Sequence, residues 1–233
     1  MEYQKNSSLQ TRCPMHKLSM FAGMDSRLLG FLQTLNSNNL IYQDAEPIYG
    51  VNSPAKHFYI LHDGYVKLSK TLSSGKEQII RVLKAGELFG FDGFVDELYN
   101  HSAVSLRKTE VCCIPVSELQ KLGECKAELE RLIMVRCIKE LQHADERLLE
   151  LGAKRSAERL ASFLLAWCAG TPVGRATPLV LSRLEIAQLL GLTIETVSRL
   201  FASWKRAGII KENRQAIQII NLPQLSAFST SQH

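Results

Sequence analysis

Short apolar runs separated by turn residues fill the region from Ile41 to Ser117. Turns are indicated by Asp63-Gly64 and Ala85-Gly86, and the apolar runs lie at His57–Leu61, Tyr65–Leu68 and Gln78–Leu83. Runs of this length at this spacing are typical of β-sandwiches and barrels. We therefore predict an all-β domain over residues 38–117, preceded by an arm and a short helix over 1–37.

The pattern then changes to that of a long helix. Residues 127–151 contain neither Gly nor Pro and are rich in Glu, Lys, Arg and Leu. Alternating steps of three and four residues place an apolar stripe along it, formed by Met134, Cys137, Leu141, Ala144, Leu148 and Leu151. A second identical helix would cover this stripe, so we predict a dimerisation helix over 118–151. Alternatively, the stripe packs on the chain's own β domain.

The last third of the chain predicts a helix-turn-helix followed by a wing. Ser182 can cap one helix, Gly191 can take the left-handed conformation of a sharp turn, and Thr193 can cap a second helix. Before the motif, the apolar run Leu179–Leu181 is a candidate for a short strand. After Gly208, two apolar runs flank a polar stretch, which predicts a hairpin. Residues 152–233 are thus predicted to be a winged helix-turn-helix, and the whole chain an α+β protein.

The second helix of this motif is predicted to read DNA. Helical spacing turns Val197, Leu200, Phe201 and Trp204 inward, and leaves Ile194, Glu195, Ser198 and Arg199 outward near the N-terminus. Arginine can bind guanine, glutamate can accept from a cytosine amino group, and serine can serve either kind of base. Phosphate contacts are predicted for Ser182, Thr193, Lys205 and Arg206. The alternative is a plain three-helix bundle in which Glu195 and Arg199 form a surface ion pair.

Charge supports a nucleic-acid partner. Residues 152–233 carry ten Lys or Arg and four Glu, a net charge of +6, whereas residues 1–151 carry a net charge of −1. A basic domain joined to a nearly neutral one is typical of a module that approaches phosphate. Double-stranded DNA is therefore the expected partner, against the alternative of a merely solvated basic face.

Other features narrow the class of protein. The first nine residues are polar and no run of about 18 apolar residues occurs, so we expect a soluble cytoplasmic protein without a membrane segment. Six cysteines at irregular spacings, with no C-x-x-C pair, favour reduced thiols over a zinc site or a disulfide framework. No catalytic fingerprint is present, and an enzyme is not expected.

These motifs resemble the Crp/Fnr family of transcription regulators, in particular the branch of the fumarate and nitrate reduction regulator. The resemblance runs from about Cys13 to Ile220, and three stretches carry it: Gly64–Lys67 with Gly86–Asp92, Ala157–Ala161, and Gly191–Arg199. It implies a cyclic-nucleotide-binding-type β-roll (jelly-roll-like) and a homodimer whose Glu195, Ser198 and Arg199 read an inverted repeat of TTGAT-like half-sites. The cyclic-AMP receptor has an arginine where this chain has Ile194, which suits a thymine methyl group better.

The resemblance also bears on an iron-sulfur cluster. Family members with a [4Fe-4S] cluster use a tight set of N-terminal cysteines and one cysteine of the β domain as ligands. Here Cys13 and Cys112 fall at such positions, and Gln10 and Ser19 replace the other two. We therefore expect no cluster.

Other effectors can be considered in the same way. Members that bind cyclic nucleotides use a Gly-Glu and an Arg-Ser pair, where this chain has Phe91-Asp92 and His101-Ser102, so cyclic AMP is not expected. Haem-dependent nitric oxide sensing stays open, with axial ligands among His16, His57, His62, His101 and His143. Thiol sensing by Cys13, Cys112 or Cys113 stays open too.

The resemblance favours activation through contact with RNA polymerase. The weak candidate for this contact is the loop formed by Thr71, Ser73, Ser74, Gly75 and Lys76. The resemblance implies that iron-sulfur members carry an acidic residue at the position of Ala144, where two carboxylates would repel each other across the dimer axis. Because Ala144 removes this repulsion, we expect this chain to dimerise without an effector. A small-ligand sensor whose output is contact with another protein is the alternative function.

Overall fold

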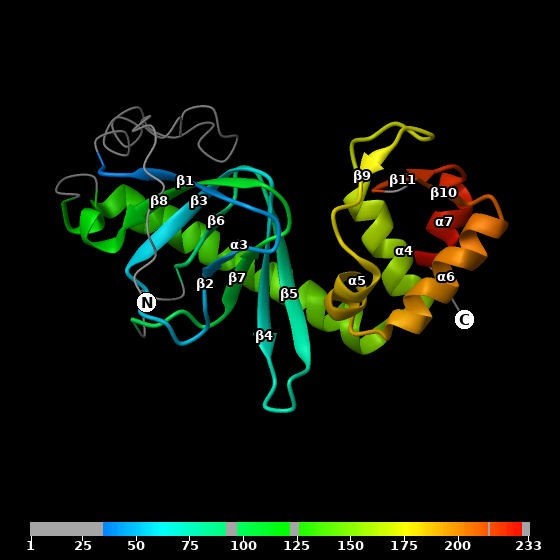
Figure 1. The fold of residues 1–233 in the computed structure, drawn as a ribbon, viewed down its shortest axis with the longest axis horizontal. Helices are drawn as coiled ribbons and strands as arrows, with labels where there is room; N and C mark the ends of the chain where they lie inside the picture. The colour runs from blue at the N-terminus through cyan, green and yellow to red at the C-terminus, as the bar shows by residue number, and fades with distance from the viewer. Residues whose placement is uncertain (1–34, 92–96, 122–125, 214, 230–233) are drawn as a thin grey trace. The chain divides into compact units, whose positions relative to one another are not determined.

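The structure is a computed structural model that describes residues 35–91, 97–121, 126–213 and 215–229 (Figure 1). The chain divides into two compact units. The first comprises Met1–Lys70 and Ile80–Val135, and the second comprises Thr71–Ile79 and Arg136–His233.

Two antiparallel four-stranded sheets form the β domain. One has the order β1-β8-β3-β6 and the other β2-β7-β4-β5. Their strands are β1 (Asn38–Tyr42), β2 (Pro47–Tyr49), β3 (His57–Asp63), β4 (Tyr65–Thr71), β5 (Glu77–Lys84), β6 (Leu88–Phe89), β7 (Ser102–Ser105) and β8 (Thr109–Pro115). The apolar run of β3 fits its place in a sheet, since Phe58, Tyr59, Ile60 and Leu61 are all buried.

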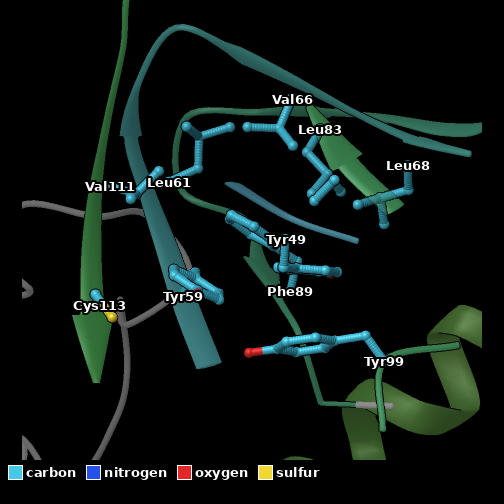
Figure 2. Close-up of a cluster of buried hydrophobic side chains, with 11 residues drawn as sticks. Tyr49, Tyr59, Leu61, Val66, Leu68, Leu83, Phe89, Tyr99, Val111 and Cys113 are labelled. Atoms are coloured by element: carbon cyan, nitrogen blue, oxygen red, sulfur yellow. The ribbon is translucent and has the colours of Figure 1, made fainter. Parts of the chain in front are cut away.

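Aromatic rings fill much of the space inside the β domain (Figure 2). The ring of Tyr49 stacks on that of Tyr99 with 3.7 Å between centroids, and the ring of Tyr59 stacks on that of Phe89 at 5.0 Å. Aliphatic side chains from β3, β4, β5 and β8 complete the cluster. Burial of large apolar surface on the facing strands is what stabilises this domain.

Gly64 is the residue that permits the tight β3–β4 turn. Its φ is +93°, and a Cβ there would lie 2.5 Å from Thr109 Oγ1 and 2.8 Å from the Lys108 carbonyl oxygen. Both the dihedral angle and the space exclude a side chain.

A 3-10 helix, η3 (Val116–Lys121), follows the last strand of the β domain, and α3 (Lys126–Ala153) comes next. The structure thus has these two elements where the sequence predicted one helix over 118–151. Helix α3 includes Gly152 and ends at Ala153, two residues beyond the predicted end at Leu151. The ion pair between Lys154 Nζ and Glu150 Oε1, at 3.1 Å, extends the i,i+4 contacts past the glycine.

The C-terminal region forms a helical group with a small sheet. Its elements are α4 (Ser156–Trp167), β9 (Thr177–Pro178), α5 (Arg183–Leu190), α6 (Ile194–Arg206), β10 (Ile210–Asn213), β11 (Ala216–Ile219) and α7 (Leu222–Ser229), with sheet order β10-β11-β9. The sequence suggested a strand at Leu179–Leu181, but the strand lies at Thr177–Pro178. Leu179 and Leu181 are buried in the core instead. The predicted α+β fold is confirmed.

Candidate DNA-binding surface

The first helix of the motif, α5, begins with a capping box. Ser182 Oγ accepts a hydrogen bond from the Glu185 N–H at 3.2 Å, and Glu185 Oε2 accepts one from the Ser182 N–H at 2.9 Å. These bonds satisfy backbone donors at the start of the helix. The predicted cap is confirmed, and the exposed Ser182 stays a predicted phosphate contact.

The turn and the second cap also match the sequence prediction. Gly191 has φ 61° and ψ 39°, the left-handed conformation, and its N–H donates to the Ala187 carbonyl. Thr193 Oγ1 accepts from the Thr196 N–H at 3.2 Å and so caps α6. Ala187 is 2% exposed, so a small side chain lies buried between the two helices, whose residues are in contact.

Helix α6 has one buried face and one exposed face. Val197, Phe201 and Trp204 are at most 2% exposed, whereas Leu200 is only half-buried. The four predicted base-reading residues are all exposed on the first two turns: Ile194, Glu195, Ser198 and Arg199. The buried anchors therefore orient α6 so that its N-terminal end presents these side chains to solvent.

The charged groups on this face are available to a ligand. Hydrogen bonds from its own backbone N–H and from the Thr193 side chain lower the pKa of Glu195, which keeps it an acceptor at neutral pH. Among the described residues, no ion pair joins Glu195 to Arg199, so the surface pair considered as an alternative is not formed. Arg206, on the last turn of α6, is exposed as well.

A charged network connects α5, α6 and the wing. The guanidinium carbon of Arg183 lies 3.4 Å from the ring centroid of Phe201, and an Arg183 nitrogen donates to Glu212 on β10. Lys205 Nζ lies 3.0 Å from the other oxygen of Glu212. Burial opposes ionisation of Glu212, but hydrogen bonds and charge from Lys205 and Arg183 outweigh it and lower its pKa.

Sequence reasoning missed Arg183 and Glu212. No local pattern indicates their partners. Phe201 and Glu212 lie 18 and 29 residues from Arg183 in the sequence, and Lys205 lies 7 residues from Glu212. The network matters because Lys205, a predicted phosphate contact, is held by a carboxylate of the same chain. If Lys205 contacts DNA phosphate as predicted, Glu212 is expected to compete with that phosphate for it.

Two substitutions are expected to change DNA affinity in opposite directions. Lys205→Ala should weaken binding to every sequence alike and reduce the salt slope by about one unit, because one phosphate contact is lost. Glu212→Gln should raise the affinity for every sequence by up to about fivefold, since a partly exposed ion pair of roughly 0.2–1 kcal/mol no longer holds the lysine. Titration of labelled duplexes at several salt concentrations measures both effects.

The control is Asp44→Asn, the same carboxylate-to-amide change at an exposed position of the first unit. It should leave affinity nearly unchanged. An equal gain in Glu212→Gln and Asp44→Asn would contradict specific competition for Lys205 and leave only an effect of net charge.

The predicted dimer stripe is largely exposed in the single chain. Met134, Leu141 and Leu148 are 64%, 63% and 70% exposed, and Cys137 and Ala144 are exposed too. Leu151 differs: it is half-buried, and a Cβ placed on Gly191 would lie 3.2 Å from its Cδ2. Further exposed apolar residues broaden the face beyond the predicted stripe, namely Val135, Ile138 and Leu149.

The sensor candidates lie in different environments. Cys112 and Cys113 are buried on β8, whereas Cys13, Gln10, Ser19 and His16 lie outside the described residues. Among the histidines, His101 Nε2 is 2.8 Å from Tyr49 Oη, and His143 Nδ1 is 3.6 Å from Glu146 Oε2. Within the described residues, no group of three or more His, Cys, Asp or Glu side chains is placed to hold a metal ion.

The candidate polymerase loop is the tip of the β4–β5 hairpin. Residues 71–76 are all exposed. The turn is closed by backbone hydrogen bonds from the Leu72 N–H to the Lys76 carbonyl at 3.0 Å and from the Gly75 N–H to the Leu72 carbonyl at 2.9 Å. This loop can therefore be reached by another protein.

None of the helices in the described part of the chain is long and apolar enough to cross a membrane.

Comparisons with known proteins find matches to both the β domain and the helix-turn-helix. Residues 40–124 match the family described as "Cyclic nucleotide-binding domain", and residues 158–228 match the "Crp-like helix-turn-helix domain". The chain is 31% identical to the "Transcriptional regulatory protein btr" of Bordetella pertussis, over 91% of this chain and 90% of that protein. It is 26% identical to the "Nitrogen fixation regulation protein FixK" of Bradyrhizobium diazoefficiens, over 98% of this chain and 97% of that protein.

A solved structure gives the same result. FixK2 from Bradyrhizobium japonicum superimposes with a TM-score of 0.77 at 30% identity, covering 85% of this chain and 100% of that chain. Its likeness spans both the β domain and the helix-turn-helix. The chain therefore belongs to the Crp/Fnr family of DNA-binding transcription regulators.

Proposed function

We propose that the chain forms a homodimer, binds an inverted repeat of TTGAT-like half-sites, and activates transcription there through contact with RNA polymerase. The observation that carries this proposal is the outward face of α6, on which Ile194, Glu195, Ser198 and Arg199 are all exposed. The buried anchors of α6 fix the direction in which these four side chains point.

Each exposed side chain suits a contact in the major groove. Arg199 can donate two hydrogen bonds to guanine O6 and N7, and the ionised Glu195 can accept from a cytosine amino group. Ile194, which is 40% exposed, offers an apolar surface to a thymine methyl group. These three chemistries are those needed for a half-site with both T·A and G·C pairs.

Two half-sites require two recognition helices, and α3 supplies the surface that would join them. Its exposed apolar side chains repeat at steps of three and four residues over about five turns. The chemistry matches a second copy of the same helix, because a two-fold axis brings identical side chains together. Contact with RNA polymerase is proposed for the exposed loop at residues 71–76.

We further propose that DNA binding needs neither a [4Fe-4S] cluster nor cyclic AMP. The described residues do not fit a nucleotide well, because stacked rings occupy the interior of the β domain (Figure 2). At the position where an arginine would pair with the phosphate, His101 is hydrogen-bonded to Tyr49. Cys112, which stands at the position of the β-domain cluster ligand, is fully buried.

Titration of DNA under two atmospheres tests this function. Protein purified without oxygen should bind a duplex carrying the TTGAT inverted repeat far more tightly than a scrambled duplex of equal composition. The same affinity is expected after exposure to air and without added nucleotide, because no oxygen-labile group takes part. Absorption spectra and iron and sulfide analysis accompany the titration.

Different results would overturn different parts of the proposal. Equal affinity for the repeat and the scrambled duplex would contradict specific readout. Iron and sulfide near four per chain, lost in air together with DNA binding, would contradict the cofactor-free mechanism.

A further inference from the structure

Arg159 joins the helices α3, α4 and α5 through residues that all belong to the second unit. It lies in the first turn-and-a-half of α4, and its guanidinium donates three hydrogen bonds to backbone carbonyls. Nε donates to Lys154 at 2.9 Å, Nη1 to Leu190 at 3.1 Å, and Nη2 to Leu151 at 2.6 Å. One side chain thus contacts the end of α3 and the end of α5.

These carbonyls lie where helices leave acceptors without helical partners. Leu151 belongs to the last turn of α3, Lys154 is the first residue after α3, and Leu190 is the last residue of α5. The final four carbonyls of a helix have no helical N–H to accept from, and a cation there is favoured by the helix dipole. Arg159 therefore acts as a shared C-terminal cap for α3 and α5.

The same place is tightly packed against the turn of the helix-turn-helix. A Cβ on Gly191 would lie 3.2 Å from Leu151 Cδ2 and 3.5 Å from Arg159 Nη1. Lys154 Nζ adds a hydrogen bond to Ser162 Oγ on α4 at 2.8 Å. The turn of the DNA-reading motif thus contacts the last residue of the proposed dimer stripe.

We infer that Arg159 is a positioning residue that fixes the helix-turn-helix on the end of α3. This inference rests on the proposed dimer, in which the two α3 helices lie together. Fixing the turn on each α3 then sets the separation between the two recognition helices, and so the half-site spacing that the dimer accepts. Binding all three carbonyls needs donors that are fixed in one plane, as in a guanidinium. A lysine ammonium also has three N–H donors, but it cannot present them in a planar fork.

The test is a spacing profile for the full-length protein. Affinity is measured for duplexes in which the two half-sites are moved apart or together by one to four base pairs, and for a duplex with a single half-site. Wild type should prefer one spacing sharply. In Arg159→Lys, the ratio between the preferred spacing and its neighbours should fall by about tenfold, while single half-site affinity and salt slope stay unchanged.

The matched control is Arg175→Lys, the same change at an exposed arginine of the same unit. It should keep the wild-type profile. Thermal unfolding and sedimentation show whether each variant is folded and dimeric. If Arg159→Lys does not fold, Arg159→Gln, which keeps one planar donor group, is measured in its place with the same expectation.

The outcomes separate this inference from the proposed function. A wild type that binds neither the repeat nor the half-site contradicts the proposed function. A flat wild-type profile, an unchanged profile in the Arg159 variant, or an equal loss on the half-site contradicts the positioning role alone.

Discussion

Ala144→Asp should turn the dimer into monomers at micromolar concentration. Ala144 is exposed on α3 between Leu141 and Leu148, which are 63% and 70% exposed in the single chain. A two-fold axis would bring the two new carboxylates together in an apolar seam. Desolvation and repulsion should cost on the order of several kcal/mol per dimer, or more than a hundredfold in the dissociation constant.

Sedimentation of wild type and variant measures this change, with parallel binding to the inverted repeat. DNA affinity should fall with dimerisation, because each half-site binds weakly alone. The control is His143→Asp, since His143 lies about 200° around the helix from Leu141 and is exposed. A monomeric wild type, or an Ala144→Asp protein that remains dimeric and binds normally, would rule out α3 as the dimer seam.

Arg199→Ala should lose specific binding while keeping non-specific binding. Loss of a bidentate guanine contact is expected to cost about 1–3 kcal/mol on the repeat, with little change on random DNA. The exposed position of Arg199 on the second turn of α6 gives this prediction its physical basis. Competition titrations against random DNA give the ratio of the two affinities.

Arg206→Ala provides the comparison for this variant. Arg206 is also exposed on α6 but lies in its last turn, where phosphate contacts are predicted. Its removal should weaken all sequences alike. Were Arg199→Ala to weaken both kinds of DNA equally, base readout by Arg199 would be excluded.

The helix-turn-helix could be predicted well from the sequence because its signals are local. The capping residues Ser182 and Thr193 lie next to the helices they begin, and Gly191 is the residue type that a left-handed turn requires. Periodicity then separates the buried Val197 and Phe201 from the exposed residues of α6 that are predicted to read DNA.

Other features depend on contacts between distant parts of the chain, and the sequence does not indicate them. Arg159 and Arg183 resemble any surface arginine in the sequence, yet one caps two helices and the other stacks on Phe201. Likewise, nothing local shows that Glu212 holds Lys205. The short strand likewise lies at Thr177–Pro178 and not at the predicted Leu179–Leu181, because β11 pairs with Thr177 and Pro178.

Selection of bound duplexes from a random DNA pool measures most directly whether two copies of α6 read an inverted repeat. The wild-type protein should enrich TTGAT-like half-sites in inverted orientation, with their centres about one helical turn apart. Arg199→Ala should lose the preference at the guanine position while the rest of each half-site persists. Enrichment of no motif, of a single unrepeated half-site, or of direct repeats would contradict recognition by a symmetric dimer.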